Sequence, residues 1–154
     1  MSDLDYKKKS GGELLQESSI YHVESAYDNT NVRKQFQELK ANVCDLNPAL
    51  VTKCITGTEQ DFIMLMKRAS DYIDKNYLDC SEEDRKLLLE MFSHSVFGYY
   101  VLTPLILSKE VSDIKVLDYN HVVVKAGGER YLADVSFFSE EDYRTWYERI
   151  LRIH

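Results

Sequence analysis

Histidine, cysteine and carboxylate side chains are the groups in this chain that could perform acid–base, nucleophilic or metal chemistry. The three cysteines, Cys44, Cys54 and Cys80, are ten and twenty-six residues apart. No two of the four histidines are separated by four residues. These spacings do not match a zinc site, so we assign no metal ligands. We also assign no catalytic residues and no cofactor-binding residues, because no local sequence signature supports one. A Cys–His nucleophilic pair stays open, because such partners meet in space and not in sequence.

Two short acidic runs are the next candidates for chemistry. Residues 82–84 and 140–142 both read Glu-Glu-Asp, and each run directly follows a serine, Ser81 or Ser139. A serine before carboxylates is typical of a helix start, where each carboxylate opposes the helix dipole and stabilises the helix by about 0.3–1 kcal/mol. We therefore interpret both runs as helix starts and not as catalytic carboxylate pairs.

Phosphate-binding chemistry would require a glycine-rich loop of the form G-x-x-x-x-G-K-[ST]. The chain has no such loop, and none of its glycines follows a strand with a Gly-Lys pair behind it: Gly11, Gly12, Gly57, Gly98, Gly127 and Gly128. Without this loop the backbone has no cradle for a nucleotide's phosphates. We predict that this chain is not itself an enzyme.

The composition is that of an ordinary globular protein and limits the classes of partner. The chain has 154 residues, of which 44% are hydrophobic and 29% charged, with a net charge of −7. An acidic balance argues against a nucleic-acid-binding surface, which needs clustered Lys and Arg. No apolar run approaches the roughly 18 residues needed to span a bilayer. An odd, irregular set of cysteines predicts free thiols in a reducing cytoplasm.

The elements that would position these residues change along the chain. Residues 1–30 are polar and weakly patterned, and they predict a mobile tail. A helical bundle is predicted over residues 31–103. Its first helix has an apolar stripe made of Val32, Phe36, Leu39, Val43 and Leu46. A second, short helix is expected to begin with Pro48 in its first position. Gly57 is expected to close this short helix in a left-handed conformation.

Two further helices have clearer signals. Thr58 with Asp61, and Ser81 with Asp84, resemble capping boxes. The stripe of the first of these helices is Phe62, Leu65, Met66, Ala69, Tyr72 and Ile73. The stripe of the second is Leu88, Met91, Phe92, Ser95, Val96 and Tyr99, with Pro104 following as a stop.

The period then changes from helical to strand-like. Residues 112–118, 121–126 and 130–135 predict three strands, and Gly127-Gly128 predicts a tight hairpin between the last two. Ser139 starts a last helix whose buried face would be Tyr143, Trp146, Tyr147 and Ile150. We predict an α+β fold, in which a helical bundle precedes an antiparallel meander and one packed helix over residues 104–154.

A series of short motifs runs through residues 92–152 in a fixed order. They are Phe97-Gly98, Pro104-Leu105-Ile106-Leu107, Val111-Ser112-Asp113-Ile114, Asn120, Val122-Val123-Val124, Gly127-Gly128, Phe137-Phe138 and Arg149-Ile150. This order resembles the N-terminal domain of the type II and type IV secretion ATPase superfamily, and most of all its tight-adherence (Flp) pilus branch. Residues 32–91 match the preceding helical region more loosely. One departure is that residues 99–103 replace the second glycine of the family's Phe-Gly-x-Gly turn and lengthen it.

The resemblance implies a mechanical part and not a catalyst. In this family the N-terminal domains form a ring above the motor domains of a hexamer and transmit motion to an inner-membrane platform protein. The Walker A, acidic and histidine boxes belong to the motor domain, and this chain stops at His154 before them. The expected partners are therefore the chain's own motor domain, neighbouring subunits and the platform protein, and not nucleic acid. ATP and Mg²⁺ would be cofactors of the longer parent protein, and this chain itself would bind no cofactor.

Two other functions stay open beside this one. A stand-alone adaptor would bind a protein partner through the helical bundle, and a small enzyme would use an unseen Cys–His or carboxylate site. The expected location is the cytoplasm, including the inner face of the cytoplasmic membrane. Without motor domains to supply ring contacts, we expect a monomer or a weak dimer.

Overall fold

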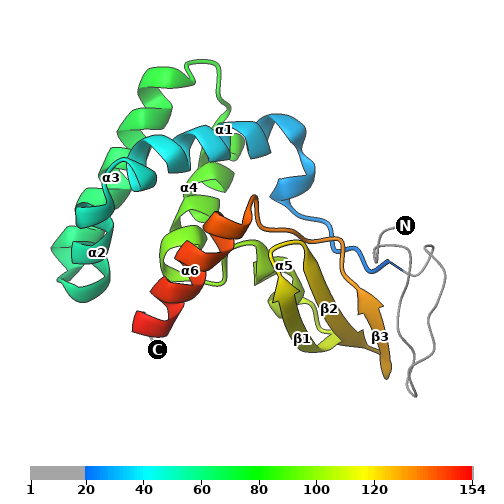
Figure 1. Cartoon of the computed structure of the whole chain (residues 1–154). Helices are drawn as coiled ribbons and strands as arrows, with labels where there is room; N and C mark the ends of the chain where they lie inside the picture. The colour runs from blue at the N-terminus through cyan, green and yellow to red at the C-terminus, as the bar shows by residue number, and fades with distance from the viewer. Residues whose placement is uncertain (1–19, 154) are drawn as a thin grey trace. The chain divides into compact units, whose positions relative to one another are not determined.

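The computed structural model of the chain describes residues 20–153, in which helices come first and a small antiparallel sheet and a last helix follow (Figure 1). This order confirms the predicted α+β class. Backbone contacts divide the chain into two compact units. The sheet unit contains residues 20–24 and 101–147 of the described chain, and the helical unit contains residues 25–100 and 148–153.

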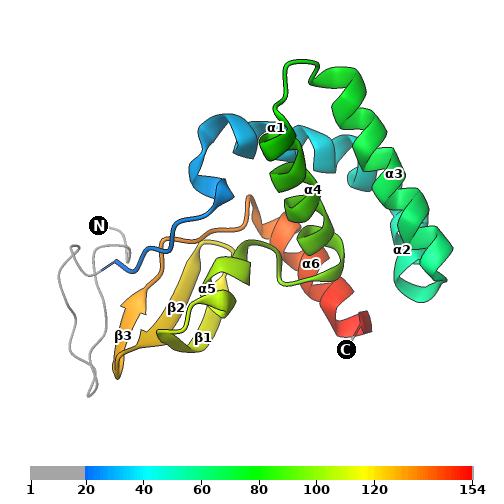
Figure 2. The same ribbon diagram turned by 180° about the vertical axis from the view of Figure 1, so that it is seen from behind.

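The helical unit is built from α1 (Thr30–Lys40), α2 (Pro48–Thr56), α3 (Glu59–Asn76) and α4 (Glu82–Phe97). The view of Figure 1 and the view from behind in Figure 2 both show α2 and α3 side by side, and α1 contacts both α3 and α4. Most members of the predicted apolar stripes are buried in its core, among them Val32, Phe36, Leu39, Leu65, Ala69, Ile73, Leu88, Phe92 and Val96.

The first stripe ends in a π-helical turn, η4 (Ala41–Asp45), that continues directly from α1. Val43 inside this turn is buried, as predicted, but Leu46 just after it is 72% exposed. The prediction that Leu46 shares the buried face is therefore wrong. A π-helix bonds residue i to residue i+5 and places more residues in each turn, so the residues after it rotate away from an α-helical stripe.

The predicted N-terminal caps of α3 and α4 are confirmed. The backbone N–H of Thr58 donates to the Asp61 carboxylate at 3.0 Å, and Thr58 and Asp61 together form a capping box. The Ser81 hydroxyl accepts from the Asp84 N–H at 3.0 Å. Each cap satisfies backbone donors that the first turn of a helix leaves without a partner.

Gly57 ends α2, but not in the predicted left-handed conformation, because its φ is −100°. The prediction of a left-handed residue there is wrong. A Cβ atom at this position would instead collide with the Asp61 carboxylate and with the Lys53 carbonyl. Glycine is therefore needed here for space, so that the end of α2 and the cap of α3 can approach each other.

The sheet unit contains β1 (Val111–Asp118), β2 (His121–Ala126) and β3 (Glu129–Leu132), paired antiparallel in the order β1-β2-β3. Gly127 and Gly128 have φ values of 59° and 82°, which confirms the predicted tight hairpin. Positive φ at both central residues is the backbone of a type I′ turn, whose twist fits the twist of the strands.

A short helix that the sequence did not predict, α5 (Thr103–Leu107), precedes the sheet. Pro104 lies in its first turn, where a missing N–H costs no hydrogen bond. Leu105 of α5 is fully buried, and α5 packs on β1. The main buried side chains of the sheet unit are Leu105, Val122, Val124, Leu132, Phe137 and Trp146.

Residues 20–29, at the end of the predicted tail, are part of the folded structure. The Tyr21 N–H donates to the Leu132 carbonyl at 2.9 Å, and its ring lies 5.7 Å from that of Tyr131. Ser25 and Asp28 form a capping box on a short 3₁₀-helix, η3 (Ala26–Asp28). Residues 1–19 of the predicted tail lie outside the described residues.

The last helix, α6 (Glu140–Ile153), follows the predicted stripe in part. Trp146 is 6% exposed, and Tyr143 packs against Phe137 with ring centroids 4.9 Å apart. Tyr147, however, is 47% exposed, so its place on the buried face is wrong. Arg149 is buried instead, three residues after Trp146 and on the same side of the helix.

Candidate functional site

The cysteine thiols do not have the environment of a nucleophile. Cys44 and Cys54 are buried and Cys80 is half-buried, and none of them is in a disulfide. Burial raises the pKa of the Cys44 thiol to about 11, against the opposing effect of Arg149 and Lys40. Burial also raises the pKa of Cys54 and of Cys80. A reactive cysteine needs a lowered pKa, because the thiolate is the attacking species.

Two histidines of the sheet unit lie beside aspartates. His121 Nδ1 is 2.8 Å from the Asp118 carboxylate at the turn between β1 and β2, and His22 Nδ1 is 3.2 Å from Asp134. Burial works against the charged Asp118 carboxylate, but hydrogen bonds from the Asn120 N–H and from His121 outweigh it and lower the pKa of Asp118. A His–Asp pair resembles two members of a catalytic triad.

The hydroxyl of Ser136, a serine that follows the sheet, is hydrogen-bonded to the backbone and not to a histidine. Ser136 Oγ donates to the Phe137 carbonyl at 2.6 Å and lies 3.4 Å from the Tyr119 carbonyl. The Asp118–His121 contact therefore closes the β1–β2 turn, and we assign it no catalytic step. His94 of α4 is exposed. The groups singled out in the sequence are thus not gathered into one site within residues 20–153.

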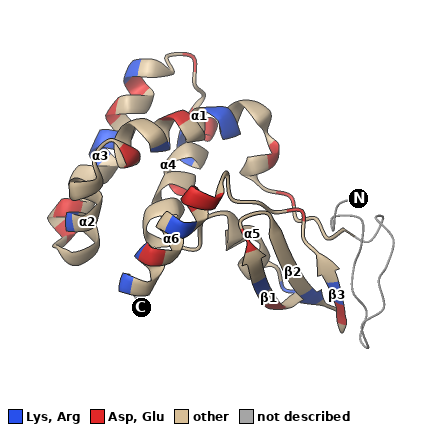
Figure 3. Ribbon diagram, in the orientation of Figure 1, with Lys and Arg blue, Asp and Glu red and all other residues tan. Residues whose placement is uncertain are grey.

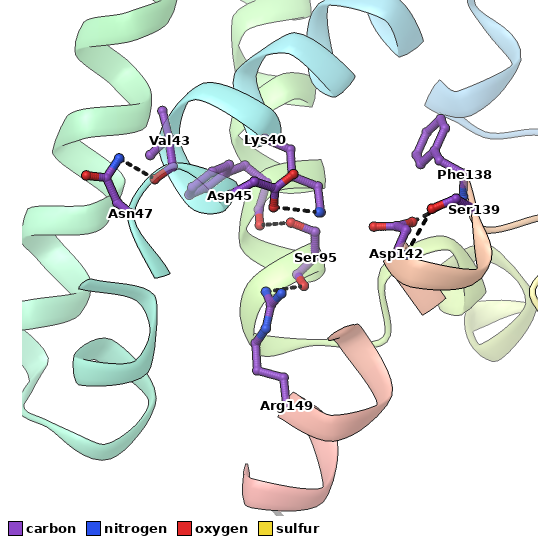
Figure 4. A network of polar contacts seen from close by, with 10 residues as sticks. Lys40, Val43, Asp45, Asn47, Ser95, Phe138, Ser139, Asp142 and Arg149 are labelled. Atoms are coloured by element: carbon purple, nitrogen blue, oxygen red, sulfur yellow. Dashed lines mark hydrogen bonds and ion pairs between the residues drawn. The ribbon is translucent and has the colours of Figure 1, made fainter. Parts of the chain in front are cut away.

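The acidic runs occupy the first turns of α4 and α6, as the sequence predicts. The Ser139 hydroxyl accepts from the Asp142 N–H at 3.0 Å, and the Asp142 carboxylate accepts from the Phe138 N–H at 3.1 Å (Figure 4). Glu140 pairs with Arg144 at 3.1 Å along the surface of α6. These contacts start and support a helix.

Buried cations are a feature that sequence reasoning missed. Lys40 and Arg149 are 7% and 6% exposed. Lys40 Nζ lies 3.3 Å from the Asp45 carboxylate, and an Arg149 N–H donates to the Ser95 carbonyl at 3.2 Å (Figure 4). A buried charge is costly unless it is paired or hydrogen-bonded, and both groups meet that condition. Arg149 thus ties the end of α6 to α4 within the helical unit.

Tyr99 and Tyr100 have opposite environments, and the prediction that Tyr99 belongs to the buried stripe of α4 is wrong. Tyr99 is 45% exposed, whereas Tyr100 is fully buried with its ring centroid 5.9 Å from that of Phe36. Tyr100 also has φ +52°, and it is the one non-glycine residue with positive φ among the described residues. A bulky residue in this conformation is strained, and such strain persists only where the surrounding packing holds it.

No protein-family model matches the chain, and a search of curated proteins finds no match to it. Within residues 20–153, no three His, Cys, Asp or Glu side chains are grouped so that they could hold a metal ion. No helix in this same part of the chain is long and apolar enough to cross a lipid bilayer.

A groove of about 420 Å³, with polar and apolar side chains in its wall, lies in the helical unit. It lies between η4, the start of α2 and one face of α3, and Val43 and Tyr72 contribute an apolar part of its wall. Its polar lining consists mainly of three asparagines and two cations: Asn42, Asn47, Asn76, Arg68 and Lys75. The sequence gives no local signal for the groove, because its walls come from segments that are far apart in the sequence, η4 and α3.

Proposed function

We propose that this chain is the non-catalytic N-terminal module of a secretion or pilus-assembly ATPase, of the tight-adherence branch of the type II and type IV secretion superfamily. In that role it belongs to the ring above the motor domains of a hexamer. It couples ATP turnover in those domains to the inner-membrane secretion machinery.

The observation that carries this proposal is the backbone at Tyr100. The family turn reads Phe-Gly-x-Gly, and counting from Phe97-Gly98 places the second glycine at position 100. Tyr100 has φ +52°, a conformation that glycine adopts freely and that costs other residues about 1–2 kcal/mol. The chain keeps a backbone suited to glycine at the position where the residue type departs from the family.

The order of the elements also supports the proposal. Residues 111–114 open β1, residues 122–124 lie inside β2, and Gly127-Gly128 forms the turn to β3. Phe137 after the sheet is buried, and Arg149-Ile150 lies in α6. The motifs of β1, of β2, of the Gly127-Gly128 turn and of α6 therefore fall in elements of the kind that the resemblance implies. Phe137-Phe138, for which the resemblance implies a strand, lies outside any strand, and residues 104–107 lie in the helix α5.

ATP and Mg²⁺ belong to the motor domain in this proposal, and no residue of this chain is given a chemical step. The hinge transition expected in such a motor is a rigid-body movement of the N-terminal module over the nucleotide. The contribution of this chain is then mechanical, and the buried contacts inside each of its two units serve the rigidity of that unit.

The proposal is tested by sequencing the coding DNA beyond the codon for His154. We expect the reading frame to continue into a motor domain with a G-x-x-x-x-G-K-[ST] loop. A frame that ends without one contradicts the proposal. A second test is an ATPase assay on the purified 154-residue chain, in which we expect no turnover above a heat-denatured sample. Measurable turnover would also contradict it.

A stand-alone adaptor that binds a protein partner is the second candidate. The groove of the helical unit favours it, because Arg68 and Lys75 both line the groove and neither has an ion-pair partner among residues 20–153. A reading frame that stops after His154 would favour this candidate over the first.

A further inference from the structure

We propose that the groove between η4 and α3 is a docking site for an acidic linear peptide segment of a partner protein. This inference does not depend on the proposed function, because it uses residues of the helical unit alone. The nature of the ligand follows from three features of the groove: its unpaired cations, the fixed direction of its asparagine side chains, and the spacing of the cations along α3.

The cations of the groove are available to a ligand. Arg68 and Lys75 are exposed on α3, and no other residue in the described part of the chain pairs with them. Asp71 lines the same groove, but its carboxylate is held by Lys67 at 3.0 Å. Figure 3 shows basic and acidic residues interspersed along α3, so the groove is not part of a large patch of positive charge. What distinguishes the groove is that two of its cations have no ion-pair partner among the described residues. Two cations without ion-pair partners favour a ligand that carries carboxylate groups, because each charge can then form a charge-assisted hydrogen bond.

The asparagines of the groove present acceptors in a fixed direction. Asn42 Nδ2 donates to the Glu38 carbonyl at 2.8 Å and to the Tyr72 hydroxyl at 3.1 Å. Asn76 Nδ2 donates to the Tyr72 carbonyl at 2.8 Å, and Asn47 Nδ2 donates to the Val43 carbonyl at 3.1 Å. Each amide nitrogen is thereby used within the protein.

The amide oxygens of these asparagines are left for the ligand. None of the three Oδ1 atoms accepts a hydrogen bond from another described residue. Oxygen acceptors suit the N–H groups of an extended main chain, while the cations suit its carboxylate side chains. A free inorganic anion would use the cations alone. A peptide uses both sets of groups and can also lie against the Tyr72 ring.

The spacing of the cations sets the spacing of the ligand's carboxylates. Arg68 and Lys75 are seven residues apart on α3, which at about 1.5 Å per residue is roughly 10 Å. A polyproline II segment rises about 3.1 Å per residue and repeats every three residues. Carboxylates three residues apart on one face of such a segment span roughly 9 Å. The groove therefore fits a Glu-x-x-Glu segment in an extended conformation.

The test is an NMR titration of the full chain with the peptide acetyl-Gly-Glu-Ala-Ala-Glu-Gly-amide, which keeps a main-chain N–H at every residue. We expect saturable shifts in the side-chain amides of Asn42, Asn47 and Asn76 and in the backbone of residues 68–76. The same peptide with both Glu replaced by Lys should give no shifts there. About 1 M salt should abolish binding, because the Debye length is then about 3 Å.

The decisive variant is Arg68→Glu with Lys75→Glu, which should weaken binding of the peptide about tenfold or more. A matched control is Lys34→Glu with Lys86→Glu, which makes the same charge change on exposed residues of α1 and α4 outside the groove. The control should keep the wild-type affinity. If the double groove variant does not give a folded spectrum, Arg68→Gln and Lys75→Gln replace it, each with a partial loss expected.

Several results would overturn the proposal. These are an absence of saturable shifts with the Glu peptide, shifts confined to residues outside the groove, and equal weakening by the control variant. Tighter binding of a single-stranded oligonucleotide than of the peptide at the same residues would also overturn it, because the groove would then serve a nucleic acid.

Discussion

Tyr100 and Cys44 show how the packing of the helical unit imposes unusual states on single residues. Tyr100 is fully buried in a left-handed backbone conformation. Cys44 is buried close enough to Lys40 and Arg149 to interact with their charges. In both cases the surrounding core fixes a state that the isolated residue would not prefer, so each state can be tested by a substitution that changes one property.

The strain at Tyr100 predicts a reversed order of stability for two substitutions. Tyr100→Ala and Tyr100→Gly lose the same contacts with Phe36 and Tyr27, whose ring centroids lie 5.9 and 6.4 Å from that of Tyr100. Elsewhere a helix or strand interior favours alanine over glycine by about 0.5–1 kcal/mol. At φ +52° we expect the glycine variant to be the more stable, by about 1 kcal/mol, in urea unfolding.

The control for this comparison is the same pair of substitutions at Lys86, an exposed residue inside α4. There Lys86→Ala should be more stable than Lys86→Gly by about 1 kcal/mol. If alanine is the better residue at position 100 as well, Tyr100 does not hold a left-handed conformation in solution.

The raised pKa of Cys44 predicts a loss of stability at alkaline pH. Burial raises the pKa of this thiol from 9.0 to about 11, so between these values the folded state keeps a proton that the unfolded state has lost. The contribution of the Cys44 thiol to the free energy of unfolding is fully present below pH 9.0, and it is lost as the pH rises toward about 11. At 1.36 kcal/mol per pH unit, the loss is about 2–3 kcal/mol.

The measurement is urea unfolding of the wild-type chain and of Cys44→Ala between neutral pH and the alkaline end of this range. Other titrating groups, such as Tyr77, are present in both proteins, so the difference between the two curves isolates Cys44. We expect this difference to narrow or change sign as the pH rises. Parallel curves would show that the thiol is not buried in the folded state.

At the scale of elements, much of the fold follows from local sequence signals. The Thr58–Asp61 and Ser81–Asp84 caps, the buried stripes of α3 and α4, and the Gly127-Gly128 hairpin were all predictable, because each depends on residues close in the sequence. Such signals agree with one another wherever the element is long and regular.

The hairpin between β2 and β3 allows the backbone contribution of a glycine to be measured alone. A Cβ atom at Gly127 would meet no other atom within 4 Å, so a substitution there has no steric cost with neighbours. Its φ of 59° is the left-handed region, which asparagine tolerates and a β-branched residue does not. We expect Gly127→Asn to change stability by less than about 0.5 kcal/mol. Gly127→Val should lose about 1–2 kcal/mol or more in thermal unfolding.

Equal losses for Gly127→Asn and Gly127→Val would contradict this interpretation, because both side chains point into open space. A loss at Gly127→Asn alone would indicate that another chemical group approaches the turn. The paired design therefore separates a requirement for backbone conformation from a requirement for space, which is the requirement at Gly57.

The features that could not be predicted lack a readable signal in the local sequence, each for its own physical reason. The turn η4 moves Leu46 off its stripe, and α5 has only five residues, too few to show a helical period. Arg149 is buried with an N–H donating to the Ser95 carbonyl, and that partner is 54 residues away in the sequence. The groove combines these effects, since one wall is the π-helical turn and the other is α3.

At the scale of the whole molecule, the outer edge of β1 is a surface through which a second copy could associate by backbone hydrogen bonds. β1 is an edge strand of the sheet, and no strand in the described part of the chain pairs with its outer side. Its register with β2 shifts between Val111 and Asp113 and again between Val116 and Asp118. Such bulges, with charged residues such as Asp113 and Lys115, are what natural proteins use to block pairing between edges.

We therefore predict that the chain sediments as a monomer or weak dimer at micromolar concentration, and that Asp113→Val with Lys115→Val increases its association. Removing these charges leaves an apolar edge, which favours pairing with a second copy. The control is Glu38→Val with Lys34→Val on α1, which removes one charge of each sign at exposed positions far from any strand edge in the sequence. Sedimentation velocity over a range of concentrations measures both variants. A stable hexamer of the unmodified chain would contradict the prediction, and so would equal association of the two variants, because the charges on β1 would then have no special role.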